Sequence, residues 1–228
     1  MLESHSLALC LQTVCAHAEG VVGAQTALAG VVSLAASTAE IVDVSVTSVV
    51  YGTVVTAATS SPTLYELDHL EGPHTEAFRT ANQQAVLDMR AELKWHNFAT
   101  HCQKLGYSTA VALPLVSSTG VLGTLNLFSP RPEVFLQGVP ETIEPFIALS
   151  ANVLLVERNR SEHSREMTTL KSRMLRREEI DQAKGVLVAK MRCSVERATE
   201  LLIEQSQREN RKLHDVAHEV VKLAGGVQ

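Results

Sequence analysis

Basic and amide side chains gather at two places near the end of this 228-residue chain. The stretch "QRENRK" holds three cations and an amide within five residues: Arg208, Asn210, Arg211 and Lys212. Further upstream, Arg177 and Lys184 are seven residues apart, so on a helix they would project in nearly the same direction. Cations neutralise phosphates, and amides hydrogen-bond to the edges of unstacked bases. Both groups therefore suit contact with a nucleic acid.

Gly185 follows Lys184 in the middle of "IDQAKGVLVAKM", whose apolar residues recur at helical spacing. A glycine inside a helix costs about 1 kcal/mol relative to alanine. We therefore expect Gly185 to leave room for a sugar-phosphate backbone, with Lys184 as its charge partner. The alternative is that Gly185 lets another helix pack closely.

The charges of the chain are unevenly distributed. Residues 158–228 carry 15 of the 20 Lys and Arg residues but only 11 of the 25 Asp and Glu residues, within a net charge of −5. This asymmetry indicates a nucleic-acid contact confined to the C-terminal part, although solvated mixed-charge helices would also explain it. No aromatic residue follows Phe146, so recognition would depend on phosphates, shape and polar base edges rather than on stacking.

Other site chemistries find little support in the sequence. His214 and His218 are four residues apart and could share a metal, but no further ligand stands at metal-site spacing, so we expect no metal. The four cysteines form no CxxC pair, which favours free thiols in a reducing compartment. GxSxG, P-loop and HExxH motifs are absent from the sequence, so we expect no catalytic residue, no cofactor and no enzyme.

The composition is that of a globular protein, with 45% hydrophobic and 20% charged residues. The longest stretch of low polarity, residues 21–36, is interrupted by polar side chains and too short to cross a bilayer, so it predicts a buried helix. The first residues lack the positive flank of a signal peptide. We therefore expect a cytoplasmic protein with no membrane partner.

The first part of the chain alternates helix and strand patterns. Helices are expected over 5–18, 25–37 and 95–105, and strands in a hairpin over 43–60 with Gly52 near its middle, at 85–89, and twice within 109–129. Ser61-Pro62 and Gly72-Pro73 should each begin a short helix with proline at its first position. This order predicts an α+β domain around a mainly antiparallel sheet, which we place at residues 1–140.

No strand pattern returns after Pro140. A 3-4 repeat runs from Phe146 to Arg177, and seven of its ten positions are apolar, which predicts the seam of a parallel coiled-coil dimer over 141–172. Arg160 and His163 interrupt this seam, and they would weaken it while restricting its register. The alternative is a single long helix that packs on its own domain.

Three short amphipathic helices are expected over 173–226, packed as an all-α bundle. The first should end near Met191, the second should begin after Ser194 as its N-cap, and the third should follow "QRENRK" and end at Gly225-Gly226.

Residues 170–222 resemble the ANTAR domain. The features that match in order are Ile180, Ala183-Lys184-Gly185, a Glu-rich second helix, Ser206-Gln207, Asn210, and Lys212-Leu213 before Val216-Ala217. The resemblance implies an RNA-binding module of transcription antitermination regulators. Together with the chemistry above, it gives the residues expected to contact RNA: Arg177, Ala183, Lys184, Gly185, Gln207, Arg208, Asn210, Arg211 and Lys212.

Residues 40–136 look like a GAF domain of the kind joined to ANTAR in actinobacterial proteins. The matching stretches are "LEGPH", "VLDM", "LGYSTAVALPL" and "GVLGTLNLFS". His74 stands where relatives often have a cysteine, so no role of that cysteine is carried over. His74 is a candidate contact for an unknown small-molecule ligand, although a structurally satisfied histidine is the alternative.

The combined resemblance implies a homodimer that grips paired RNA stem-loops in nascent transcripts. Holding them prevents an overlapping terminator hairpin, and the GAF domain controls this by sensing a signal. Two other functions stay open: a DNA-binding regulator, and a small-molecule sensor that signals to a protein partner. The expected recognition-helix signature of a DNA reader is missing from "LHDVAHEVV".

Overall fold

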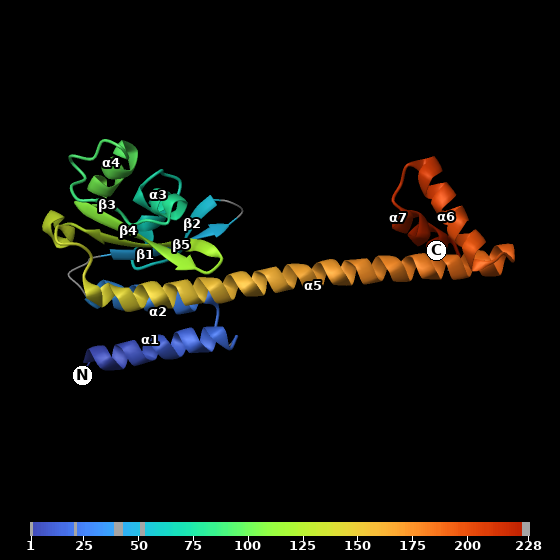
Figure 1. The fold of residues 1–228 in the computed structure, drawn as a ribbon, viewed down its shortest axis with the longest axis horizontal. Helices are drawn as coiled ribbons and strands as arrows, with labels where there is room; N and C mark the ends of the chain where they lie inside the picture. Colours follow the sequence, from blue (N-terminus) through green and yellow to red (C-terminus); the bar gives the residue numbers. More distant parts are fainter. Residues whose placement is uncertain (1, 21, 39–42, 51–52, 225–228) are drawn as a thin grey trace. The chain divides into compact units, whose positions relative to one another are not determined.

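The computed structural model describes residues 2–20, 22–38, 43–50 and 53–224 (Figure 1). The chain divides into two compact units, Met1–Asn159 and Arg160–Gln228. This division falls inside the 141–172 segment that the sequence predicts as a linker. The turn predicted at Gly52 and the helix end predicted at Gly225-Gly226 lie outside the described residues.

The first unit is built on a five-stranded sheet in the order β2-β1-β5-β4-β3, and every neighbouring pair is antiparallel. Its strands are β1 (Asp43–Val50), β2 (Thr53–Thr59), β3 (Gln84–Val86), β4 (Thr109–Ser117) and β5 (Gly120–Ser129). The predicted α+β class, with its hairpin, third strand and final strand pair, is confirmed.

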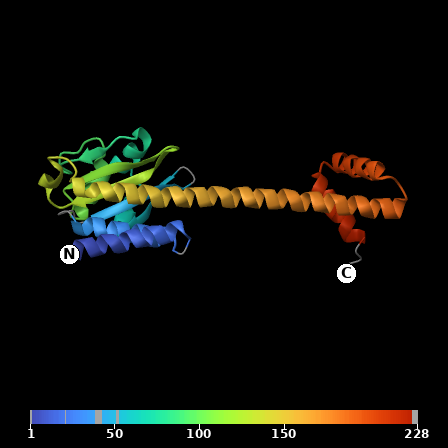
Figure 2. The same cartoon turned by 60° about the horizontal axis from the view of Figure 1, so that its bottom comes forward.

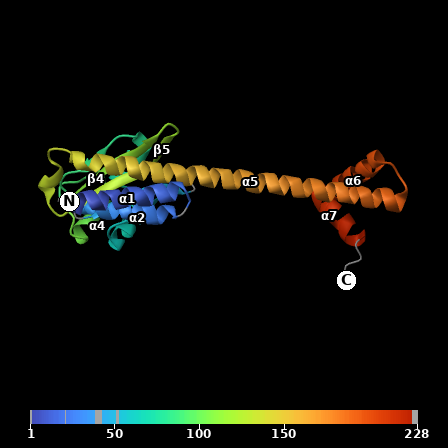
Figure 3. The same cartoon turned by 90° about the horizontal axis from the view of Figure 1, so that it is seen from below.

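One face of this sheet is covered by helices from both ends of the unit. Helix α2 (Ala24–Thr38) packs on β1 and β2, and α1 (Leu2–Ala18) packs on α2. The first turns of α5 (Glu144–Met191) lie on the same side, as Figures 2 and 3 show. The apolar core here includes the fully buried Leu28 and Val31 of α2, so residues 21–36 contain the predicted buried helix.

The other face carries short helical elements: the 3₁₀ helix η1 (Pro62–Leu67), α3 (Pro73–Thr80) and α4 (His96–Lys104). Proline stands in the first turn of η1 and of α3, as predicted, where its missing N–H costs nothing. Phe98 of α4 and Met89 centre a second apolar cluster. Two further 3₁₀ turns, η2 (Pro132–Phe135) and η3 (Glu141–Ile143), lead into α5.

A chain of buried polar side chains crosses β1 and β5. Thr47 Oγ1 lies 2.6 Å from Thr124 Oγ1, which donates to Asn126 Oδ1 at 2.9 Å. Asn126 Nδ2 in turn donates to Ser45 Oγ at 3.2 Å. Because the hydroxyl of Thr124 has one proton and donates it to Asn126, the hydroxyl of Thr47 must be the donor to Thr124. These four buried side chains satisfy one another, which removes most of the cost of burying them.

The start of α5 differs from the predicted coiled-coil seam. Phe146 and Val153, its first and third positions, are buried in the core of the first unit, so this part packs on its own domain. From Ser161 to Glu178, by contrast, every side chain except that of Ser172 is exposed. The start of the repeat therefore serves the monomer, while its later part is left uncovered.

The second unit packs the end of α5 with α6 (Val195–Glu209) and α7 (Leu213–Ala224). Its small core centres on Ala183, Leu202, Val216 and Ala217. Ser194 is the N-cap of α6, since its side chain accepts a hydrogen bond from the Arg197 amide at 3.2 Å. The predicted end near Met191, the two following helices and this cap are confirmed, but the first of the three helices is the end of the continuous α5 rather than a separate short helix.

Within the described ranges, none of the helices is both long and apolar enough to cross a membrane. All four cysteines are free thiols.

Candidate nucleic-acid interface

The turn between α6 and α7 depends on Asn210. Its backbone is left-handed (φ 51°, ψ 41°), a conformation that asparagine adopts more readily than other residues with a side chain. The backbone N–H of Asn210 donates to the Gln207 carbonyl at 3.2 Å, and the backbone N–H of Arg211 donates to the Ser206 carbonyl at 3.0 Å. The Ser206 hydroxyl closes the turn by donating to the Arg211 carbonyl at 2.6 Å. The backbone of Asn210 therefore ends α6, while its side-chain amide is exposed at the surface.

This turn brings five of the predicted RNA-contacting side chains together on the surface. All of them are exposed: Gln207, Arg208, Asn210, Arg211 and Lys212. Arg211 Nη1 pairs with Glu209 at 2.9 Å and with Glu219 at 2.6 Å. Hydrogen bonds to these two carboxylates raise the pKa of Arg211 above its usual value, so the guanidinium stays charged. The turn thus presents fixed positive charge, partly balanced by its own carboxylates.

A second group of cations lies on α5 around Asp181. Lys184 Nζ is 3.0 Å from Asp181 Oδ1, and Arg177 Nε is 3.9 Å from Asp181 Oδ2. The Lys184 side chain is 23% exposed, whereas that of Arg177 is 88% exposed. The role of Asp181 was missed from the sequence, although its spacing of four from Arg177 and three from Lys184 is the signal for such pairs on a helix.

Gly185 is exposed, and a Cβ built there would meet no atom within 4 Å outside its own helical turn. No helix among the described residues packs closely against Gly185. Close packing of another helix therefore does not explain Gly185 within a single copy, and the surface at Gly185 is open.

We predict that Gly185→Ala separates stability from binding. The second unit should gain up to about 1 kcal/mol in free energy of unfolding, because alanine favours the helix and the site has room for its methyl group. RNA affinity should fall if a sugar-phosphate backbone approaches at this position. Denaturant unfolding followed by circular dichroism, beside RNA titration, measures both. Unchanged RNA affinity in a stabilised variant would remove Gly185 from the interface.

Ala183 does not belong to this surface. It is fully buried against Leu202, Val216 and Ala217, so its side chain is inaccessible to RNA in this structure. We therefore treat Ala183 as a packing residue whose small size lets α5 approach its neighbours.

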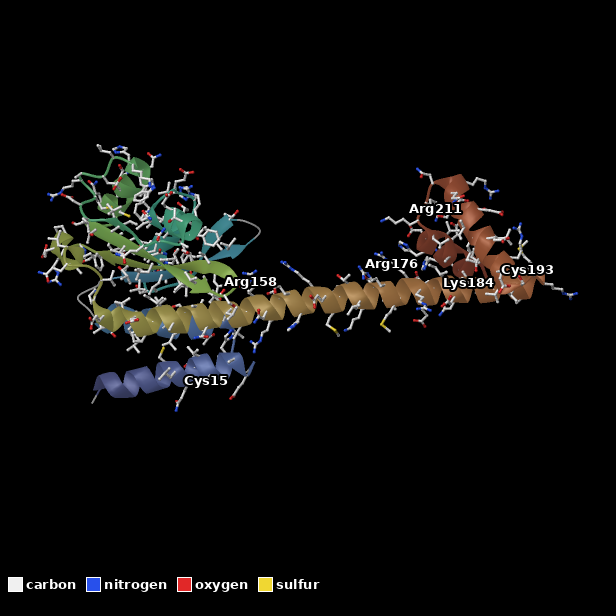
Figure 4. The ribbon with its side chains drawn as sticks, in the orientation of Figure 1. Cys15, Arg158, Arg176, Lys184, Cys193 and Arg211 are labelled. Atoms are coloured by element: carbon white, nitrogen blue, oxygen red, sulfur yellow. The ribbon has the colours of Figure 1, made fainter. Side chains whose placement is uncertain are left out.

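The two groups of cations remain separate. Figure 4 places Arg211 at the turn between α6 and α7 and Lys184 on α5, and no ion pair between described residues joins the two groups. His218 on α7 does pair with Glu179 on α5, at 3.2 Å, and His214 lies 3.3 Å from Asp215. Across the described ranges, no cluster of three or more residues could hold a metal ion.

His74 lines a small cavity in the first unit. This cavity has a volume of about 10 Å³, which is enough for a single water molecule. The other residues that line it are Ser45, Thr47, Thr56, Leu64, Leu67, Asp68, Asn126 and Phe128. His74 is 5% exposed, and its Nε2 atom has no hydrogen-bond partner among the described residues. Burial lowers the pKa of His74 to about 4, against a smaller opposing effect of Asp68. His74 is therefore a neutral imidazole at neutral pH.

The ANTAR domain model matches residues 168–221, which include the end of α5, α6 and α7. Among solved structures, the GAF domain of a phosphoenolpyruvate-protein phosphotransferase from Coxiella burnetii is 17% identical with a TM-score of 0.51, covering 72% of this chain and 99% of that one. The reduced form of fRMsr from Staphylococcus aureus is 13% identical with a TM-score of 0.50, covering 64% and 94%. At these identities the likeness concerns the fold alone. No curated protein matches the chain. Residues 168–221 are thus an ANTAR domain, and they follow a domain with the GAF fold.

Proposed function

We propose that this chain is an RNA-binding regulator of transcription antitermination. Its ANTAR domain grips stem-loops of nascent transcripts, and its GAF-fold domain controls that binding. The observation that carries the proposal is the exposed group of cations and amides at the α6–α7 turn, within the residues that match the ANTAR model. RNA is read mainly at unstacked loop bases and along its phosphates, which require these groups.

The charges of the second unit support contact with phosphates. Arg208, Arg211 and Lys212 are exposed at one turn, and Arg177 and Lys184 add positive charge on α5. With no aromatic residue after Phe146, base stacking contributes little, and affinity comes mostly from phosphates and released counterions. Binding should therefore weaken steeply as salt is added.

The GAF-fold domain supplies regulation in this proposal. An unknown small molecule is its candidate signal, and the small cavity beside His74 is the candidate binding place. Ligand pockets usually have several hundred Å³, so this cavity would have to open before it admitted anything larger than water. The protein acts as a homodimer in the cytoplasm, where nascent transcripts are made, and as a regulator rather than an enzyme.

The test is a titration of the full chain with a tandem stem-loop RNA over a range of salt concentrations. Wild type should bind tightly, and Arg211→Ala should lower affinity roughly tenfold and reduce the slope of log K against log salt by about 0.7, one phosphate contact. Arg197→Ala is the matched control, because Arg197 also pairs with two carboxylates, Glu200 at 2.8 Å and Glu204 at 3.1 Å, but lies outside the turn.

Asn210→Gly refines the same titration. Glycine tolerates the left-handed backbone at this position, so the turn keeps its shape while the amide is lost. A loss of affinity would then report a contact of the amide itself. Equal affinity for RNA hairpins and duplex DNA would favour a DNA-binding regulator, and weak binding without salt dependence would favour a protein-docking role.

A further inference from the structure

Four cations lie close together on α5, just before α6 and α7 pack against it. Lys171, Arg173, Arg176 and Arg177 fall within seven residues, and no acidic residue stands between Met167 and Arg177. All four cationic side chains are exposed. Arg176 and Arg177 follow Arg173 by three and four residues, so these three side chains share one side of the helix. We call these three residues the stalk arginines.

The chain does little to balance the charge of the stalk arginines. Arg173 and Arg176 have no ion-pair partner among the described residues, and Arg177 reaches Asp181 only at 3.9 Å. Glu179 is three residues from Arg176, but its carboxylate lies 3.2 Å from the imidazole of His218 on α7. Like charges at spacings of three and four residues destabilise a helix. A helix that keeps this repulsion without relief breaks a local rule of stability, and such exceptions mark functional surfaces.

The stalk arginines continue the proposed RNA-binding surface along α5, the helix on which Figure 4 labels Arg176 and Lys184. Arg177 and Arg173 precede Lys184 by seven and eleven residues, so both project within about 20° of it. Arg176 precedes Ala183 by seven residues, so it projects toward the side on which α6 and α7 bury Ala183. At 1.5 Å for each residue, the row from Arg173 to Lys184 is about 16 Å long.

We propose that Arg173 and Arg176 bind the phosphates of an RNA stem, so that the stem lies along α5 while its loop meets the α6–α7 turn. Side chains contact a double-stranded RNA mainly through its phosphates and 2′-hydroxyls, and the guanidinium fork binds phosphate with two parallel hydrogen bonds. The amides of the turn suit unstacked loop bases. This inference rests on the proposed function and adds two contacts to those that the sequence predicts.

Titration of the full chain with a tandem stem-loop RNA over a range of salt concentrations tests the proposal. Arg173→Gln combined with Arg176→Gln should lower affinity roughly tenfold or more. It should also reduce the slope of log K against log salt by about 1.8, which is two contacts at about 0.9 each. Lys171→Gln is the matched control, because Lys171 is equally charged and exposed but points about 160° away from Arg173. Its affinity should stay within about twofold of wild type.

Two further measurements separate this contact from folding and from base recognition. Denaturant unfolding followed by circular dichroism should find the double variant at least as stable as wild type, because glutamine removes the repulsion between the arginines. Phosphates carry no sequence information, so the double variant should lose the same factor in affinity when the loop sequence is scrambled. The factor lost by Asn210→Gly should shrink with that RNA.

Several results would overturn the proposal: an affinity that the double variant leaves unchanged, or an equal loss in Lys171→Gln, which would report net charge alone. A loss that depends on the loop sequence would do the same, as would a double variant less stable than wild type. If Arg211→Ala still weakens binding in these cases, the RNA-binding proposal stands without the stalk arginines. If wild type binds no RNA, both proposals fail.

Discussion

Replacing Gly123 by alanine should unfold the sheet of the GAF-fold domain. A Cβ at this position on β5 would lie 1.9 Å from the Thr47 carbonyl oxygen of β1 and 3.0 Å from Leu154 Cδ1 of α5. The first contact is with backbone, so no rotamer change relieves it, and β1 would have to separate from β5. We expect a loss of more than about 3 kcal/mol in the free energy of unfolding.

The only tryptophan of the chain, Trp95, lies in the first unit and reports its unfolding by fluorescence in urea. Gly30→Ala is the matched control, because a Cβ at that position of α2 meets nothing within 4 Å. It should instead stabilise the helix by up to about 1 kcal/mol. Equal midpoints for the two variants would show that β1 and β5 are not as close at Gly123 as this structure has them.

The second large effect concerns acid and His74. Burial lowers the pKa of this imidazole to about 4, from 6.5 in an exposed histidine. Between these values the unfolded chain binds the proton and the folded domain does not, so stability is fully present above about pH 6.5 and is lost as the pH falls toward 4. With about 1.4 kcal/mol for each pKa unit, the loss is about 3 kcal/mol.

Urea unfolding followed through Trp95 at pH 7 and at pH 4 measures this loss. His74→Gln removes the titrating group while carboxylates elsewhere titrate as before. The variant should therefore lose about 3 kcal/mol less than wild type over the same range. A variant with the same pH dependence as wild type would show that another group controls acid unfolding.

The sequence predicted the elements of both units because their patterns are local. Alternating apolar residues marked the strands, prolines marked the starts of η1 and α3, and Ser194 marked the start of α6. The residues at the α6–α7 turn were predicted as a group because they are neighbours in the chain. These residues are exposed because they form the polar turn between two helices, and such turns lie at the protein surface.

Long-range pairings were not predicted, because no local pattern encodes them. Glu219 is eight residues from Arg211, and Glu179 is 39 residues from His218, yet both pairs form in the folded bundle. The helical repeat of α5 was recognised, but the burial of Phe146 and Val153 depends on the sheet core that they fill. Ala183 was assigned to RNA because it belongs to the Ala183-Lys184-Gly185 stretch that resembles the ANTAR domain, whereas its burial follows from the three-helix packing.

The buried polar chain from Thr47 to Ser45 has a consequence for misfolding. Two strands that pair only through apolar side chains can shift their register more easily than strands joined by specific polar contacts. A shift by one residue exchanges the two faces of a strand. Here such a shift of β1 against β5 would break the two side-chain hydrogen bonds that join these strands, Thr47 to Thr124 and Asn126 to Ser45, and leave hydroxyl and amide groups without partners in the interior. The buried polar side chains therefore favour the native alignment of β1 and β5 over an alignment shifted by one residue.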